Sequence, residues 1–331
     1  MIDQTKLPNK LDYVEFSDYH DVANAIKTMI VRGAPAIGVS GAFGLALAAI
    51  QSKATTKEDL IKDLEEARQI LFSTRPTAIN LKWGLDKIME IAKKGFNVST
   101  MKNSILEEAK KIAEDDIETN MSIGKFGSEL FNDNDTIMTH CNAGALATVA
   151  YGTALGVIRA TKDAGKRIKV IATETRPVQQ GSRLTAFELK YDGIDVSLIP
   201  DTAVGYTMVK GLVNKVVVGE DRILRTGHVF NKIGTYQVAT MAKQHGIPFY
   251  VAAPLSTFDL TSNPGDVVIE MRKADEVTGI GDKKTAPDDI NVINPAFDMT
   301  PPELISGIIT EAGIAKPPFE ESIKKLFEAN K

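Results

Sequence analysis

The feature that most constrains the fold is an alternation of short β-branched runs with helical runs between residues 136 and 254. The strand-like runs are TIMTH (136–140), RIKVIATE (167–174), DVSLI (195–199), KVVVGED (215–221) and PFYVAAP (248–254); the helical patterns between them cover about 144–162, 179–190, 203–210 and 234–245. Because parallel neighbouring strands need a crossover of helical length, this alternation predicts βαβ units and a parallel sheet with both faces covered. Ligands of such sheets collect at the carboxyl ends of the strands.

The chain before this region is helical in pattern, with apolar residues at spacings of three and four between about residues 19 and 130. At 331 residues the chain fits two packed domains. We place the boundary near 105–130, which divides the chain into a mainly helical domain (1–120) and an α/β domain (121–331). The proline-containing tail, 294–331, carries two short helical patterns and is interpreted as a wrapping or dimer-contact segment.

Composition excludes several classes of protein. With 43% hydrophobic and 25% charged residues the chain is globular, and 39 Lys plus Arg against 43 Asp plus Glu argue against a nucleic-acid partner. The single cysteine cannot form an internal disulfide, and no cationic and apolar leader is evident, so we expect a cytoplasmic protein. The uncharged run 33–50 just reaches the length of a membrane span, but its Gly and Ala content favours a buried, closely packed helix.

Two residues at predicted strand ends are candidates for catalysis. Cys141 follows TIMTH and precedes the helical pattern, so its sulfur is expected at a helix N-terminus, a position that favours the thiolate. Asp221 follows VVVG and is a candidate acid or base, with Glu220 beside it as a like charge. The alternatives are a small buried hydrophobic residue for Cys141, and a helix cap or a partner of Arg222 for Asp221.

Several cationic and polar residues are candidates for binding an anionic substrate. Arg32 and Arg75 each stand just before a proline that is expected to head a helix, and a guanidinium together with free helix N–H groups binds phosphate well. Gln180 follows the second strand, and Asn231 and Lys232 precede another helix. A Schiff base at Lys232 is the less favoured alternative to a plain hydroxyl or phosphate contact.

Motifs for cofactors and metals are missing from the sequence. It has neither a dinucleotide-binding glycine fingerprint nor a Gly-Lys-Ser/Thr phosphate loop, and its four histidines show no ligand spacing with each other or with Cys141. We therefore expect no cofactor and no metal, which leaves redox and phosphoryl-transfer chemistry without support.

Five blocks of sequence together resemble methylthioribose-1-phosphate isomerase over nearly the whole chain: RGAPAIG (32–38), THCNAG (139–144), ETRP (174–177), GEDRI (219–223) and NKIGTY (231–236). The resemblance implies a helical N-terminal domain followed by a Rossmann-like domain, a homodimer, and a role in methionine salvage, a branch of amino-acid biosynthesis. It aligns Cys141 and Asp221 with the catalytic pair of the family. It aligns the following residues with substrate-binding positions: Arg32, Gly33, Ala34, Arg75, Gln180, Asn231 and Lys232. Glu220 stands where the family is expected to carry a small residue.

The resemblance implies an isomerase that converts 5-methylthio-α-D-ribose 1-phosphate to 5-methylthio-D-ribulose 1-phosphate. Asp221 would act as general acid for opening the furanose ring, and Cys141 would move the proton from C2 toward C1; a hydride shift is the competing mechanism. Two other functions fit the same fold. One is isomerisation of ribose 1,5-bisphosphate or a 5-deoxyribose 1-phosphate. The other is a non-catalytic subunit like those of initiation factor 2B, which is not expected to keep both Cys141 and Asp221.

Overall fold

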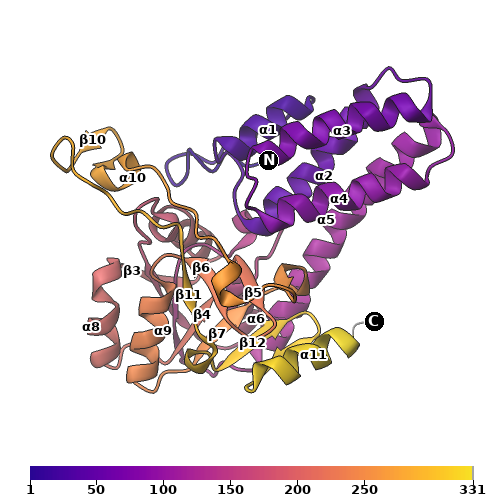
Figure 1. Cartoon of the computed structure of the whole chain (residues 1–331). Helices are drawn as coiled ribbons and strands as arrows, with labels where there is room; N and C mark the ends of the chain where they lie inside the picture. The colour runs from indigo at the N-terminus through magenta and orange to yellow at the C-terminus, as the bar shows by residue number, and fades with distance from the viewer. Residues whose placement is uncertain (330–331) are drawn as a thin grey trace. The chain divides into compact units, whose positions relative to one another are not determined.

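The computed structural model describes residues 1–329 of the 331-residue chain, which divide into two compact units (Figure 1). Unit 1 comprises Met1–Asn120 and Ala145–Gly152, and unit 2 comprises Met121–Gly144 and Thr153–Lys331. The mixed α/β character expected from the sequence is confirmed, because helices α1–α5 precede a mainly parallel sheet.

Unit 1 is built from the helices α1 (Tyr19–Lys27), α2 (Ala34–Gln51), α3 (Lys57–Ser73), α4 (Ile79–Lys94) and the first part of α5 (Val98–Ser128). Their apolar faces form one continuous core, with α2 apolar on all sides. Although α2 is long and apolar enough to cross a membrane, 67% of it is buried in the structure. It is therefore a core helix, as the Gly and Ala content predicts.

Two glycines bring α2 and α4 into backbone contact. A Cβ added to Gly84 would lie 2.3 Å from the Gly38 carbonyl oxygen, and one added to Gly38 would lie 2.7 Å from the carbonyl oxygen of Asn80. Only residues without a Cβ allow this approach. Because Gly38 and Asn80 are both near the start of their helices, the N-termini of α2 and α4 lie close together within unit 1.

Unit 2 contains a seven-stranded sheet with the order β13-β12-β7-β4-β1-β2-β3. Its strands are β1 (Thr136–Thr139), β2 (Lys169–Thr173), β3 (Asp195–Ile199), β4 (Lys215–Val218), β7 (Phe249–Ala252), β12 (Gly307–Thr310) and β13 (Gly313–Ala315). All pair in parallel except β13. The five strands expected from the sequence are thus confirmed, and the parallel sheet with them.

Helices cover both faces of this sheet because successive strand residues point to opposite sides. On one face Met138 and Val216 pack with α8 (Val204–Val209), α9 (Thr235–Gln244) and α11 (Phe319–Ala329). On the other face Ile137 and Val217 pack with the end of α5, α6 (Ala154–Asp163) and α7 (Ala186–Tyr191). Figure 1 shows α8 and α9 side by side next to the sheet.

The structure adds elements that the sequence pattern did not predict. A second sheet has the order β11-β6-β5-β8, with β5 (Arg222–Leu224), β6 (Val229–Lys232), β8 (Phe258–Asp259) and β11 (Phe297–Thr300). A hairpin of β9 (Gly279–Ile280) and β10 (Lys283–Lys284) follows the short helix α10 (Asp275–Thr278). The tail carries a 3-10 turn at Pro302–Leu304 and the helix α11, and it also supplies the strands β11, β12 and β13, which the sequence pattern did not predict.

Candidate active site

The two candidate catalytic residues follow neighbouring strands. The chain runs from β1 to β2 to β3 on one side and then returns to β4 on the other side of β1. Strands β1 and β4 pair in parallel through Ile137–Lys215 and Met138–Val216, so their carboxyl ends meet at one edge of the sheet. Such a reversal of strand order is where open parallel sheets bind ligands. Cys141 and Asp221 come just after these two strand ends.

The backbone of Cys141 is held in a conformation that side-chain-bearing residues rarely adopt. Its φ is +64°, and the residue is 7% exposed. The N–H group of Cys141 donates to Thr175 Oγ1 at 2.9 Å, and its carbonyl oxygen accepts from Thr185 Oγ1 at 2.5 Å. A strained residue of this kind costs on the order of 1–3 kcal/mol and persists only where its surroundings fix it. The two threonine hydroxyls supply that restraint.

Thr175 is itself held from the end of the next strand. Its φ is +62°, and its N–H group donates to Asp201 Oδ1 at 2.8 Å, while the N–H of Arg176 donates to Asp201 Oδ2 at 2.7 Å. A chain of contacts therefore runs from Asp201, after β3, through Thr175, after β2, to Cys141, after β1. Sequence reasoning missed Thr175 and Asp201 as site residues. Each accepts a hydrogen bond from a backbone N–H group in a segment that follows a different strand, and a sequence pattern does not reveal such contacts.

His140 connects the end of β1 to the segment that carries Lys232. Burial lowers the pKa of His140, so its ring is neutral. Nε2 lies 2.9 Å from the carbonyl oxygen of Ile233 and must carry the hydrogen, which leaves Nδ1 to accept from Thr173 Oγ1 at 2.6 Å. The hydrogen bond from Nε2 holds Ile233, which directly follows β6, beside His140, the residue that precedes Cys141.

The helix expected directly after Cys141 is not there. Residues 145–147 form a single 3-10 turn, and α6 begins only at Ala154. Tyr151 and Gly152 have φ values of +71° and +85°, which no α-helix contains. The expectation that Cys141 lies at the start of a helix over 144–162 was therefore wrong, and the neighbours of Cys141 are threonine hydroxyls.

Asp221 begins the connection from β4 into the second sheet. Its N–H group donates to the carbonyl oxygen of Phe230 on β6 at 2.9 Å, so Asp221 lies beside the strand that ends in Asn231 and Lys232. Arg222 forms an ion pair with Asp259, with Nη1 and Oδ2 3.3 Å apart. The antiparallel pairing of β5 with β6 thus gathers Asp221, Asn231 and Lys232 in one region of unit 2.

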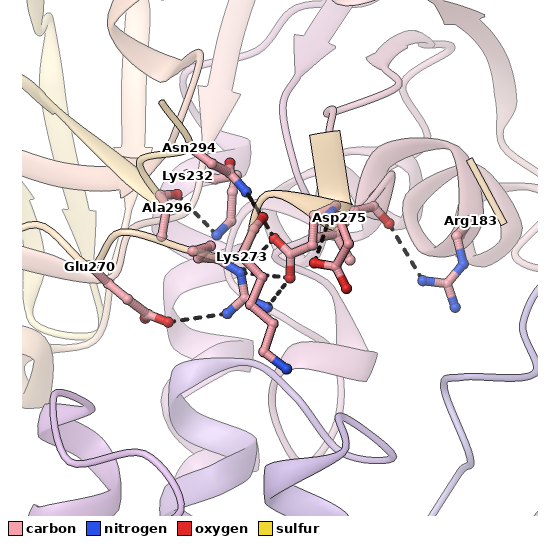
Figure 2. Close-up of polar contacts among 10 residues, drawn as sticks. Arg183, Lys232, Glu270, Lys273, Asp275, Asn294 and Ala296 are labelled. Atoms are coloured by element: carbon pink, nitrogen blue, oxygen red, sulfur yellow. Dashed lines mark hydrogen bonds and ion pairs between the residues drawn. The ribbon is translucent and has the colours of Figure 1, made fainter. Parts of the chain in front are cut away.

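The candidate substrate-binding residues of unit 2 have distinct settings. Asn231 donates from Nδ2 to Thr235 Oγ1 at 3.0 Å. Lys232 donates from Nζ to the Ala296 carbonyl oxygen at 3.0 Å (Figure 2). Lys232 Nζ also lies 4.4 Å from the centroid of the Phe297 ring. Gln180 is buried, and its Oε1 has no hydrogen-bond partner among residues 1–329. A buried acceptor without a donor is rare in a folded protein and suits a site that takes up a ligand.

A polar cluster attaches the segment before β11 to these residues. Glu276 accepts from Arg272 Nε at 2.9 Å and from Asn294 Nδ2 at 3.2 Å, and Arg272 also forms an ion pair with Glu270 (Figure 2). Arg176 donates to the Val277 carbonyl oxygen at 3.2 Å. The segment is therefore joined to the loop that carries Thr175, and through Ala296 to Lys232.

In unit 1 the structure places Arg32, Gly33 and Ala34 at the start of α2. Gly33 is the N-cap with φ +101°, and a Cβ there would lie 2.4 Å from Ala147, so this position requires glycine. The proline-headed helix expected after Arg32 is confirmed. The one expected after Arg75 is not: Pro76 and Thr77 form a turn, and α4 begins at Ile79.

The start of α2 and the turn before α4 nevertheless lie close together, because the two helices touch at Gly38, Asn80 and Gly84. Two arginines thus accompany two neighbouring helix N-termini within unit 1, an arrangement that favours anions. In the part of the chain that the structure describes, no group of three or more His, Cys, Asp or Glu side chains could hold a metal ion.

Comparison with known proteins places the chain in a family. The model of the initiation factor 2 subunit family matches residues 30–317. The methylthioribose-1-phosphate isomerase of Thermosipho africanus is 54% identical over 329 residues, which cover 99% of this chain and 95% of that protein. The chain belongs to the initiation factor 2 subunit family, in the group of the methylthioribose-1-phosphate isomerases.

Two solved structures of the family have the same fold. The 5-methylthioribose 1-phosphate isomerase of Pyrococcus horikoshii is similar with a TM-score of 0.94 and 46% identity, covering all of this chain and 93% of that one. A structure described as translation initiation factor eIF-2B, subunit delta, from A. fulgidus has a TM-score of 0.91 and 51% identity, covering 99% and 96%. The family resemblance predicted from the five sequence blocks is therefore confirmed.

Proposed function

We propose that this protein is an aldose–ketose isomerase that converts 5-methylthio-α-D-ribose 1-phosphate to 5-methylthio-D-ribulose 1-phosphate. The observation that carries the proposal is that Cys141 and Asp221 come just after the neighbouring parallel strands β1 and β4, where the strand order reverses, in a chain 54% identical to a methylthioribose-1-phosphate isomerase. In this proposal the sugar phosphate is the only substrate and no cofactor takes part.

The settings of the candidate binding residues, taken within each unit separately, support roles in holding a sugar phosphate. In unit 1, Arg32 and Arg75 accompany two helix N-termini and would hold the phosphate, with the backbone of Gly33 and Ala34. In unit 2, Gln180, Asn231 and Lys232 offer amide and ammonium groups to sugar hydroxyls or phosphate oxygens. Lys232 contacts a carbonyl oxygen and an aromatic face, which suits a charged ammonium that makes polar contacts better than a Schiff base.

The proposed chemistry follows from the position of the phosphate on the anomeric oxygen, which prevents spontaneous ring opening. Asp221 donates a proton to the ring oxygen as the bond from that oxygen to C1 breaks. Cys141 removes the C2 proton and returns a proton to C1, and the C2 hydroxyl loses its proton as the ketone forms, so two protons are added and two removed. A hydride shift from C2 to C1 is the competing route. Complete incorporation of solvent deuterium at C1 would exclude it.

The test is a ketose assay on the purified protein with 5-methylthioribose 1-phosphate and ribose 1,5-bisphosphate side by side. We expect turnover of the first substrate, and a loss of at least about 100-fold in kcat for Cys141→Ala and for Asp221→Asn, the usual size of a general acid–base contribution. Asp282→Asn, at an exposed position of the β9–β10 hairpin, is the matched control and should keep full activity.

Other outcomes of this assay point to the other candidates. Turnover of the bisphosphate alone would make the protein a ribose-1,5-bisphosphate isomerase, and turnover only of a 5-deoxyribose 1-phosphate would change the 5-substituent. The A. fulgidus structure described as a translation initiation factor subunit keeps a non-catalytic role as the second candidate. A folded protein without any turnover would favour that role.

We also propose that the protein works in the cytoplasm as a homodimer. The single cysteine suits a reducing compartment, and the homodimer follows from the family resemblance. Light scattering coupled to size-exclusion chromatography should give twice the chain mass of 35.9 kDa; a mass of one chain would contradict the dimer.

A further inference from the structure

The turn that follows Cys141 lies against a buried carboxylate. Asn142, the next residue, donates from Nδ2 to Glu188 Oε1 at 2.9 Å and to Thr185 Oγ1 at 3.2 Å. The Thr185 hydroxyl in turn donates to the Cys141 carbonyl oxygen at 2.5 Å. A Cβ added to Gly144 would lie 2.3 Å from Glu188 Oε2. Glu188 therefore lies against both Asn142 and Gly144.

The chemistry of these groups fixes the direction of each hydrogen bond. A carboxylate only accepts, and the Thr185 hydroxyl, which gives its single hydrogen to Cys141, can only accept from Asn142. The Asn142 group that faces both acceptors must therefore be its NH2, whose two hydrogens suit two acceptors. The position after the thiol thus needs a side chain that donates twice.

Thr185 and Glu188 reach this turn from one helical segment. A π-helix over Gly181–Thr185 continues directly into α7, and residues three apart on a helix lie on the same face. The start of the segment is packed tightly against the end of β2, since a Cβ added to Gly181 would lie 1.7 Å from the Thr173 carbonyl oxygen. Turns of π-helix are rare and are frequent at functional sites.

Arg159 on α6 holds Glu188 in place. It donates from Nη2 to Glu188 Oε2 and from Nε to Asp192 Oδ2, both at 2.8 Å. The side chains of Arg159 and Glu188 are only 12% and 5% exposed. A buried ion pair adds little stability over apolar side chains of the same volume. What the carboxylate provides here is a fixed pair of acceptor atoms beside the turn.

We propose that Glu188 is a positioning residue for Cys141. Held by Arg159, its carboxylate fixes Asn142 and thereby the turn that directs the Cys141 thiol. The φ of Cys141 is +64°, and backbone of this kind persists only where its surroundings impose it. Thr175 restrains the N–H group of Cys141, and the Glu188 network restrains the carbonyl side. This inference rests on the proposed function, in which the thiol transfers a proton.

The kinetic test compares Glu188→Gln with Asp192→Asn. Glutamine keeps the size of the side chain, but its NH2 group would face a donor of Asn142 or of Arg159. We expect kcat to fall about tenfold or more and KM to change far less, because a buried donor then lacks its acceptor.

Asp192→Asn is the matched control. It removes the other carboxylate bound to Arg159 and leaves the hydrogen bond from Asn142 to Glu188 in place, so kcat and KM should stay at their wild-type values. Arg159 keeps one carboxylate in either variant, so neither change leaves its buried charge unpaired and both proteins should fold. Equal losses of kcat in the two variants would overturn the inference.

A double-mutant cycle with Asn142→Ala tests the route of the effect. If Glu188 acts through Asn142, the double variant should lose no more kcat than Asn142→Ala alone, because the contact that Glu188→Gln impairs is already gone. Independent structural effects would instead multiply, and multiplied losses would overturn the inference.

Hydrogen–deuterium exchange on the free protein tests the turn without using activity. In Glu188→Gln the backbone amides of residues 139–146 should exchange about tenfold faster, because local opening of the turn costs less. Exchange there should stay at the wild-type rate in Asp192→Asn. Equally faster exchange along the whole chain in Glu188→Gln would indicate general destabilisation and would overturn a positioning role.

The two kinds of measurement separate this inference from the proposed function. Unchanged kcat in Glu188→Gln, or unchanged exchange over residues 139–146, would overturn the positioning role. If the wild type turns over no sugar phosphate, the proposed function fails. The exchange rates still decide in that case whether Glu188 holds the turn after Cys141.

Discussion

At the scale of single residues, the proposed site depends on groups that position a reactive atom without touching it. Cys141, Thr175 and Gln179 are all non-glycine residues with positive φ, and all three follow the ends of β1 and β2. Strained backbone persists where its surroundings impose it, and it collects at functional sites. The threonine hydroxyls at 175 and 185 therefore matter for the direction of the Cys141 side chain as well as for folding.

Replacing Thr175 with valine should impair Cys141 while the fold remains. Valine keeps the shape but leaves the N–H group of Cys141 without its acceptor, a loss of about 1–3 kcal/mol for a buried donor. We expect kcat to fall about tenfold or more, because the lost hydrogen bond holds the residue that carries the reactive thiol. KM should change far less. Alkylation of the thiol should slow in parallel, and because Cys141 is the only cysteine the label reports on it alone.

The conservative variant Thr175→Ser provides the matched control, because serine keeps the hydroxyl that accepts from Cys141. It should restore most of the kcat and the rate of alkylation. If valine and serine behaved alike in both measurements, the hydroxyl would not be what positions Cys141.

At the scale of helices and strands, the contact of α2 with α4 brings two helix N-termini together within unit 1. The contact depends on Gly38 and Gly84, where the helix backbones touch. Adding a Cβ at such a crossing must push the helices apart, because the atom it meets is a backbone oxygen that cannot move aside alone.

The substitution Gly84→Ala should therefore destabilise the protein by roughly 1–3 kcal/mol, the usual cost of overpacking. It should also raise KM for the sugar phosphate, because Arg32 and Arg75 lie at the ends of the helices that separate. Gly205→Ala is the matched control: Gly205 also lies in a helix, α8, but the nearest atom to an added Cβ is Met241 Sδ at 3.5 Å. Urea denaturation should show little change or a small gain there; equal losses in the two variants would contradict the crossing as the cause.

The elements also show what the sequence could predict. Five parallel strands were predicted because each is a continuous β-branched run followed by a helical pattern. The second sheet was missed because its strands are short: β5 and β6 form a small hairpin, and β8 and β11 join it from distant parts of the chain, with Phe297 opposite Lys232. The helix over 144–162 was overestimated because alanine periodicity hides the backbone turn at Tyr151 and Gly152. Cys141 and Asp221 were found through their strand ends, whereas Thr175 and Asp201 depend on contacts between strands.

At the scale of the whole molecule, charge bears on whether the protein binds a nucleic acid or a single sugar phosphate. The chain carries 43 acidic and 39 basic side chains, a formal net charge of −4. Many of the cations are already paired with carboxylates, among them Arg159 with Glu188 and Asp192, and Arg272 with Glu270 and Glu276. Neutralising many phosphates of a nucleic acid needs an excess of free cations, whereas holding one sugar phosphate needs two or three.

We therefore expect the protein to leave the fluorescence anisotropy of a labelled RNA duplex unchanged at micromolar concentration, even at low salt, where non-specific binding is strongest. The same preparation should bind the sugar phosphate, seen as a rise in melting temperature that grows with the logarithm of ligand concentration. Arg32→Ala and Arg75→Ala should reduce that rise, and inorganic phosphate should reproduce part of it, since the two arginines recognise the phosphate group. Retention of RNA together with an unchanged melting temperature would contradict this expectation, because the cations would then serve a polymer of phosphates and not a single one.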